Sequence, residues 1–373
     1  MIAVFGDNVD AQRTEVVFVD VATGKETTHV AGGAYMPQGL AWLGPNDLLL
    51  SQPKTTGSHV QLWRMSYPGG AVTPLTNDLS SYVGADITRD RTSVVTSRSD
   101  TRAAIWVGDA AGTQGTDVTS TFPISVLLTS VAWAGDRVLY STTVNGVAAI
   151  ASVIPGRGAP VDVVIDAALP AVTPDGKTVV YIKSSEDGTG LWKIDAQTGA
   201  RPVQFEKGSA FFPVVTPDNR NVVFISPRGG RQTPWIVPID GGEAKEIVHA
   251  FASAFSLDVS RDGRRVLFQT SDSQNRFKFA VCDLPDCANR IDLNLPANVG
   301  FGATRFTTDG HAVAYVDSSG SNLWAQPIRA VRRGRLRVSP IARAPTTSRP
   351  LPGRATASAW RSCGRRRPTI SCC

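Results

Sequence analysis

Long apolar runs are absent from this sequence of 373 residues. A membrane helix needs roughly 18 consecutive apolar residues, and the best stretch, Phe122 to Ala134, is broken by Ser and Thr. The first residues, MIAVFGDNVD, contain no basic segment followed by an apolar one, so they do not predict a secretory signal. We therefore expect no membrane span in this chain.

Acidic residues are missing from the last part of the chain. Residues 329–373 contain twelve Arg and no Asp, Glu or Lys, which leaves 26 basic and 32 acidic residues in 1–328. The whole chain has a formal charge of +6, but residues 1–328 have a net charge of −6. Because a nucleic-acid-binding surface needs clustered basic residues, we expect no nucleic-acid partner for residues 1–328.

Turn residues are abundant, with 34 Gly and 24 Pro, which favours an all-β fold with many short strands. An Asp recurs in the similar segments ITRD, WAGD, VTPDGK, VTPDNR, VSRDGR and FTTDGH, at spacings of 46, 39, 43, 44 and 47 residues. This period is typical of one four-stranded β-propeller blade per repeat. The recurring residues are Asp90, Asp136, Asp175, Asp218, Asp262 and Asp309. We interpret them as turn residues whose carboxylates accept local backbone hydrogen bonds, in preference to metal ligands.

Each repeat predicts four strands, most clearly after Leu169. A short apolar strand leads to the Asp turn, and then Thr178–Lys183 alternates as a second strand. Leu191–Asp195 predicts a third strand and Arg201–Phe205 a fourth. A Trp recurs in the third strand, and we expect it to pack between adjacent sheets, in preference to forming a binding platform. The Trp set is Trp63, Trp106, Trp192, Trp235 and Trp324.

The repeats predict a propeller over residues 1–328. Residues 1–33 form a partial first blade without its first strand, six fuller blades follow over 34–296, and 300–328 form a partial last blade. We expect about eight blades, with seven as the alternative, in a ring that is incompletely closed.

The segments VTPDGKTVVYIKS, from Val172, and LWKID, from Leu191, resemble the TolB-like repeat, a relative of WD-repeat propellers. The segments LWRMSYPGGAVTPLTNDLSSYVGADITRD, from Leu62, and NLWAQPI, from Asn322, are similar to the propeller region that follows the kinase domain in certain bacterial serine/threonine kinases. This resemblance implies a non-catalytic propeller that is the sensory or scaffolding part of a kinase-like parent. It also implies an extracytoplasmic location if that parent is membrane-anchored, whereas a chain made alone would be cytoplasmic.

Two alternatives remain open. One is a stand-alone periplasmic TolB-like protein that bridges envelope partners, and the other is a propeller hydrolase with a site in its channel. The sequence has no Gly-rich loop with its Val-Ala-x-Lys strand, no His-Arg-Asp or Asp-Phe-Gly motif and no Gly-x-Ser-x-Gly elbow. We therefore predict no catalytic residue and no cofactor, and a protein or small-molecule ligand bound by loops at the channel face.

Metal-ligating residues are scarce, and their spacing does not predict a metal site. The four histidines, His29, His59, His249 and His311, lie in different repeats, and we expect each on the solvated surface. Cys282 and Cys287 flank a Leu-Pro-Asp turn that could bring two strand ends to disulfide distance. In an oxidising compartment we expect a hairpin disulfide, with two inert thiols as the alternative.

The repeat pattern stops at Arg329. A basic arm that binds phosphates is one interpretation of residues 329–373, and a frameshift in the coding sequence is the one we favour. Shifted by one frame, the codons of this segment permit a Gly-Gly turn, a fourth strand and a further Asp-Gly unit. We therefore expect 329–373 to be a disordered Arg-rich tail that forms no blade, and Cys363, Cys372 and Cys373 to be accidents of frame.

Overall fold

The fold is all-β, in a computed structural model that describes residues 1–8, 13–34, 37–55, 58–109, 114–124, 130–185, 188–249, 252–271, 277–293, 295, 299–317 and 323–328. These residues contain no α-helix, and one 3₁₀ turn spans Arg228–Gly230. The predicted tail, 329–373, lies outside the described residues, so its disorder and its frameshift origin stay predictions.

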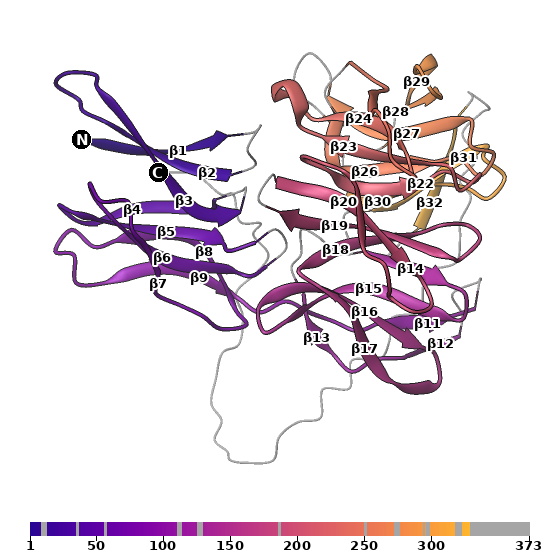
Figure 1. Ribbon diagram of the computed structural model, residues 1–373, viewed down its shortest axis with the longest axis horizontal. Helices are drawn as coiled ribbons and strands as arrows, with labels where there is room; N and C mark the ends of the chain where they lie inside the picture. The colour runs from indigo at the N-terminus through magenta and orange to yellow at the C-terminus, as the bar shows by residue number, and fades with distance from the viewer. Residues whose placement is uncertain are drawn as a thin grey trace, which may run out of the picture. The chain divides into compact units, whose positions relative to one another are not determined.

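Five sheets have four antiparallel strands in sequential order, as a propeller blade requires (Figure 1). The sequence order within each sheet means that every strand pairs with the next one through a hairpin. The sheets are β4–β7 (Gly39–Gly44, Asp47–Pro53, Val60–Ser66, Val72–Pro74), β14–β17 (Val131–Ala134, Arg137–Val144, Val147–Ile154, Arg157–Ile165), β18–β21 (Ala167–Val172, Thr178–Ser185, Gly188–Asp195, Val203–Glu206), β22–β25 (Phe211–Val215, Asn221–Ser226, Thr233–Pro238, Lys245–Glu246) and β26–β29 (Ala252–Val259, Arg265–Ser271, Phe277–Asp283, Ala288–Leu293).

The remaining sheets are smaller. Two have three strands: β1–β3 (Ile2–Asn8, Arg13–Val19, Glu26–Ala34) and β30–β32 (Val299–Phe306, Ala312–Asp317, Leu323–Pro327). Three have two strands: β8–β9 (Ser81–Ile87, Val94–Ser99), β10–β13 (Arg102–Ala103, Phe122–Pro123) and β11–β12 (Trp106–Gly108, Gly115–Asp117). The unit that follows Asp90 is therefore not the four-stranded blade that the repeat predicts.

Glycines explain part of this difference. The Trp106 ring lies over Gly108 and Gly115, where a Cβ atom would overlap the indole. Glycines within strands weaken them, because they have no side chain to pack. Among the described strands, β11 pairs with β12 alone, and Trp106 is 44% exposed.

The other four tryptophans of the set lie in equivalent places. Trp63, Trp192, Trp235 and Trp324 each occupy the third strand of a sheet, opposite Leu50, Tyr181, Phe224 and Tyr315 of the second strand. Each of the four indoles is half-buried. The third-strand expectation therefore holds for these four, and the exposed Trp106 departs from it.

The second strand of each complete sheet is buried on both faces. Val179, Val180, Tyr181 and Ile182 of β19 are each at most 1% exposed. The alternation predicted for Thr178–Lys183 was therefore wrong, because this strand has packed neighbours above and below and reads as a continuous apolar run. Burial raises the pKa of the Tyr181 hydroxyl to about 12.

The first strands of successive sheets lie beside one another, β14 with β18, β18 with β22, β22 with β26 and β26 with β30. In each complete sheet, the turns between strands 1 and 2 and between strands 3 and 4 are at one end, which we call the Asp-turn end. The turns between strands 2 and 3 and the links to the next sheet are at the opposite end, which we call the linker end. These two ends differ chemically.

Candidate functional site

The turns at the Asp-turn end satisfy their own polar groups. Asp218 accepts hydrogen bonds from the Thr216 hydroxyl at 2.6 Å and from the backbone N–H of Arg220 at 3.0 Å. The Thr216 oxygen in turn accepts the N–H of Asn221. The same pattern recurs at Asp90, Asp262 and Asp309, and Asp175 accepts from Thr173 and the Lys177 N–H. These bonds lower the pKa of each of the five carboxyl groups.

The repeated Asp is therefore a turn residue, as the sequence predicts. The Ser or Thr two residues earlier, which recurs in the sequence, was not recognised there as part of the turn. Asp136 differs from the others, since it lies in a two-residue hairpin between Ala134 and Arg137.

A second turn at this end is also self-contained. Asp195, at the end of β20, accepts the N–H groups of Gln197 and Thr198 and the Thr198 hydroxyl. Asp20, between β2 and β3, makes the equivalent bonds to Ala22 and Thr23. This match shows that β2 and β3 correspond to strands 3 and 4 of a complete sheet.

A cavity of about 440 Å³ also lies at the Asp-turn end, between the sheets β14–β17 and β18–β21. Its lining includes Arg137, Arg157 and Asp162 together with Gln197 and Thr198 of the Asp195 turn. The N–H groups of Gln197 and Thr198 and the Thr198 hydroxyl already donate to Asp195. These groups are therefore not free to bind a ligand.

The linker end contains most of the unsatisfied polar groups of the described residues. Eight buried side-chain polar atoms of the described residues have no hydrogen-bond partner. Five of these eight atoms are at the linker end. Buried polar groups are normally paired, and leaving one unpaired costs about 1–3 kcal/mol. The five are in Gln52, Thr55, His59, Asp166 and Ser226.

A polar group at the linker end, which we call the His59 cluster, consists of His59, Asp78, Ser80, Tyr82, Arg98 and Asp100. Its residues come from the turn before β6, the link between β7 and β8, the start of β8 and the end of β9. The Ser80 hydroxyl donates to Asp100 at 2.5 Å and accepts from Arg98 Nε at 2.9 Å. The Tyr82 hydroxyl and the Ser80 N–H donate to Asp78 at 2.7 and 2.9 Å.

Two contacts fix the position of His59 beside this link. The neighbouring Val60 N–H donates to the Ser81 hydroxyl at 3.4 Å, and Gln61 Nε2 donates to the carbonyls of Asp78 and Ser80 at 3.2 and 2.8 Å. His59 is 4% exposed and its Nδ1 has no partner. Burial lowers the pKa of His59, although the charges of Asp78 and Asp100 act in the opposite direction. The hydrogen bond from Tyr82 lowers the pKa of Asp78.

The surface position predicted for the four histidines was thus wrong for His59. It was also wrong for His29, which is partly buried against Phe18 with an unpaired Nε2. His249 and His311 are exposed as expected. The burial of His59 could not be predicted from the sequence, because the other residues of its cluster lie 19 to 41 residues further along the chain.

Other polar groups at the linker end differ in how well they are paired. Glu206, the last residue of β21, is 8% exposed, and Arg228 of the turn between β23 and β24 pairs with its carboxylate. Arg228 also donates to the carbonyl of Lys207 at 2.7 Å. Asp166, in the link before β18, has an unpaired Oδ1, and burial raises its pKa against the opposing charge of Lys183. Of these, the His59 cluster brings together the most functional groups.

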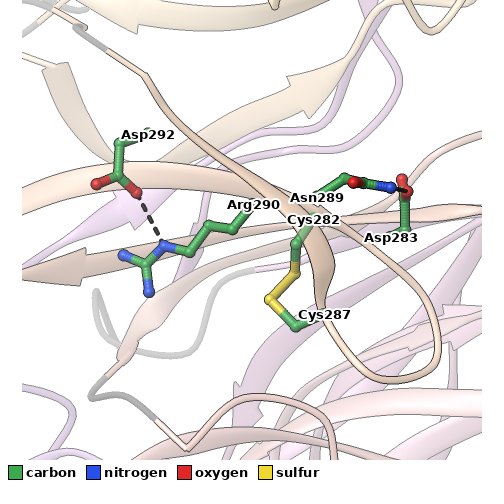
Figure 2. Close-up of a disulfide and its surroundings, with 6 residues drawn as sticks. All are labelled: Cys282, Asp283, Cys287, Asn289, Arg290 and Asp292. Atoms are coloured by element: carbon green, nitrogen blue, oxygen red, sulfur yellow. Dashed lines mark hydrogen bonds and ion pairs between the residues drawn. A yellow bond between two sulfur atoms is a disulfide. The ribbon is translucent and has the colours of Figure 1, made fainter.

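Cys282 and Cys287 are joined by a disulfide across the hairpin between β28 and β29, with their Cα atoms 4.8 Å apart (Figure 2). Cys282 is 1% exposed, whereas Cys287 lies nearer the surface. Beside the bridge, Asn289 donates to Asp283 at 2.7 Å and Arg290 to Asp292 at 2.9 Å. These polar groups are already paired with one another, so the bridge has the surroundings of a structural crosslink.

Within the described ranges, no group of three His, Cys, Asp or Glu side chains is arranged to hold a metal ion. The same part of the chain contains no helix that is long and apolar enough to cross a membrane.

Comparison with known proteins gives a likeness in fold. TolB from Acinetobacter baumannii aligns with a TM-score of 0.44 and 15% identity over 85% of this chain and 77% of that one. A protein assigned as TolB in Agrobacterium tumefaciens aligns at 0.40 and 19% over 75% and 89%. A puromycin-hydrolysing peptidase of Mycobacterium tuberculosis aligns at 0.40 and 17% over 88% and 50%. No family model and no curated protein matches the sequence. At these values, the likenesses give no ground for assigning an activity.

Proposed function

We propose that this chain is a non-catalytic β-propeller that binds a protein or small-molecule ligand through the linker end of its sheets. The main support is the contrast between the two ends. At the Asp-turn end, five of the six repeated carboxylates, those of Asp90, Asp175, Asp218, Asp262 and Asp309, are used within their own turns. At the linker end, five buried polar atoms are unpaired, so this end keeps polar groups that the fold itself does not use.

The hydrogen bonds of the His59 cluster argue against the hydrolase alternative. A serine nucleophile needs a neighbouring base that accepts its proton, most often His. Here the Ser80 hydroxyl donates to Asp100, and Arg98 donates to its oxygen. A hydrogen bond from a cation stabilises the lone pair that would attack, so Ser80 is poorly prepared for this role.

The sequence resemblance supports a narrower proposal, in which the propeller is the sensory or scaffolding part of a kinase-like parent. This proposal depends on the similarity of the segments from Leu62 and Asn322. A stand-alone TolB-like envelope scaffold is its alternative, and an upstream kinase reading frame in the genomic DNA would decide between the two.

Photocrosslinking tests the binding proposal. Three diazirine probes with an ammonium, a carboxylate or an amide group are irradiated with the protein, and mass spectrometry locates the modified peptides. We expect modification of linker-end peptides, which contain residues 54–60, 75–82, 98–100 and 226–230, and its loss in urea. Modification concentrated on the peptides with Asp175, Asp218 and Asp262 would contradict the proposal. Hydrolysis of p-nitrophenyl butyrate that His59→Gln abolishes would favour the enzyme.

A further inference from the structure

We propose that the His59 cluster binds a primary ammonium group, such as a lysine side chain or the amino terminus of a peptide. This inference rests on the proposed function, since it names the chemical class of ligand for one site at the linker end.

The arrangement of buried and exposed groups has the form of a binding site. His59 and Ser80 are 4% and 3% exposed and form its floor. Asp78, Arg98 and Asp100 are exposed and stand around it. The Nδ1 atom of His59 is buried and unpaired, and the charges of Asp78 and Asp100 act on this ring.

The cluster has more acceptors than donors. Each carboxylate has room for about four hydrogen bonds, but Asp78 accepts two, from Tyr82 and the Ser80 N–H. Asp100 accepts one from Ser80, and its second oxygen lies 3.9 Å from Arg98. Neutral histidine adds an acceptor nitrogen. A primary ammonium has three donors and no acceptor, so it matches these groups.

The charge of the cluster agrees with this assignment. Two carboxylates and one guanidinium leave one net negative charge when His59 is neutral, so a carboxylate or phosphate ligand would be repelled. The polar pair at the end of β21 differs from the His59 cluster. There, Arg228 pairs with Glu206 and neutralises the charge of its carboxylate. The surplus of acceptors is therefore a property of the His59 cluster itself.

Protonation of His59 should oppose binding. The charges of Asp78 and Asp100 act on His59, and Arg98 donates to the neighbouring Ser80. An ammonium ligand keeps its charge throughout the neutral range, because amines of the lysine type have a pKa near 10.4. When the pH falls through the pKa of His59, its ring gains a positive charge and the acceptor nitrogen is lost. Affinity for the cation should therefore decrease in acid.

The test uses the full chain with ¹³C-labelled histidine and follows the His59 Cε1–H signal by NMR, which His59→Gln identifies. We expect n-butylammonium to shift this signal saturably at millimolar concentration, whereas n-butanol, tetramethylammonium and butyrate do not. Asp78→Asn and Asp100→Asn should each weaken n-butylammonium binding at least tenfold. Asp175→Asn, at the Asp-turn end, should leave it unchanged.

A second experiment titrates the unaltered chain with n-butylammonium at pH 7.5 and 4.5. It needs no variant, so its result does not depend on whether a variant folds. We expect weaker binding at pH 4.5. A shift with butyrate or n-butanol would overturn the ammonium assignment and leave the binding role of the linker end standing. No shift with any of the four probes would also overturn it, while the crosslinking map would still test the proposed function separately.

Discussion

Backbone conformation at single residues explains several choices in this sequence. Cys287 has φ of +57°, in the left-handed region that favours glycine, and Gly24, Gly70 and Gly199 occupy the equivalent turn position in other sheets, with φ of +65° to +73°. A non-glycine residue in this conformation costs roughly 1–2 kcal/mol. The disulfide with Cys282 gives a physical reason for a cysteine there.

The free-energy cost of the positive φ at Cys287 should become measurable when the disulfide is removed. We expect the pair Cys282→Ala with Cys287→Gly to be more stable than Cys282→Ala with Cys287→Ala by about 1 kcal/mol, as measured by urea unfolding. Both should be less stable than the bridged chain, by about 2 kcal/mol for so short a loop. Equal stability of the two double variants would show that the position is not strained.

Arg91 is a second strained residue. It follows Asp90 with φ of +60°, whereas Gly176, Gly263 and Gly310 fill the same position after Asp175, Asp262 and Asp309. Arg91→Gly should stabilise the fold by about 0.5 kcal/mol, since the relief of strain exceeds the entropy that glycine adds to the unfolded chain. Gly176→Ala, the matched control, should destabilise it by about 1 kcal/mol. Differential scanning calorimetry would compare both with the parent.

His59 should make stability depend on pH. Burial holds its folded pKa below the ordinary value of 6.5, so the unfolded chain takes up the proton first. Its contribution is therefore present above about pH 6.5 and is lost as the pH falls towards the folded pKa. Between pH 7.5 and 5, the His59→Gln variant should lose less unfolding free energy than the parent, by at most about 1.4 kcal/mol per pH unit.

At the scale of strands, the apolar triplets in the second strands provide most of the core. Val222, Val223 and Phe224 of β23 are 0% exposed, as are Val266, Leu267 and Phe268 of β27. Phe224→Ala should cost about 3–5 kcal/mol. Val203→Ala in β21, where the side chain is 46% exposed, should change stability by less than about 0.5 kcal/mol. Urea unfolding of the two variants would test this difference, and a Phe224→Ala effect below 1 kcal/mol would contradict the assignment of the core.

The repeat spacing made the sheets predictable, because Asp175 and its equivalents mark the same turn in each unit and so fix where the strands begin. The short strands around Trp106 were not predictable from the same pattern. Their length depends on whether β11 forms backbone hydrogen bonds with β9, and the pattern does not contain that information. The burial of His59 depends on the links that contain Asp78 and Asp100. Contacts of this kind join residues from different repeats, and a pattern within one repeat does not contain them.

At the scale of the whole chain, each of the two three-stranded sheets lacks one strand of a complete blade, and the missing strand differs between them. The Asp20 turn identifies β1–β3 as strands 2 to 4, and β30–β32 contain the Asp309 turn of strands 1 and 2. We propose that a propeller of about eight blades would close where β1–β3 receives its missing first strand from the sequence that the alternative frame encodes after residue 328. The number of blades and the closure stay predictions.

The charge distribution predicts how the chain meets polyanions. Residues 1–328 have a net charge of −6, so a chain that ends at Ile328 should pass through a heparin column at low salt. The full chain should be retained through its twelve additional arginines and should elute as salt is raised. Circular dichroism would confirm that the shorter chain retains its β structure. Retention of the shorter chain would place a basic surface within 1–328.

The closed hydrogen bonding of the Asp195 turn has a practical consequence. Every bond that Asp195 makes to Gln197 and Thr198 begins and ends within residues 195–198, and Gly199 has φ of +65°, where an added Cβ would meet only Val163. A biotin or fluorescent dye attached close to this turn would sit at the opposite end of the sheet from the linker end. The protein could then be immobilised on a sensor chip in one orientation, with the linker end left free for screening.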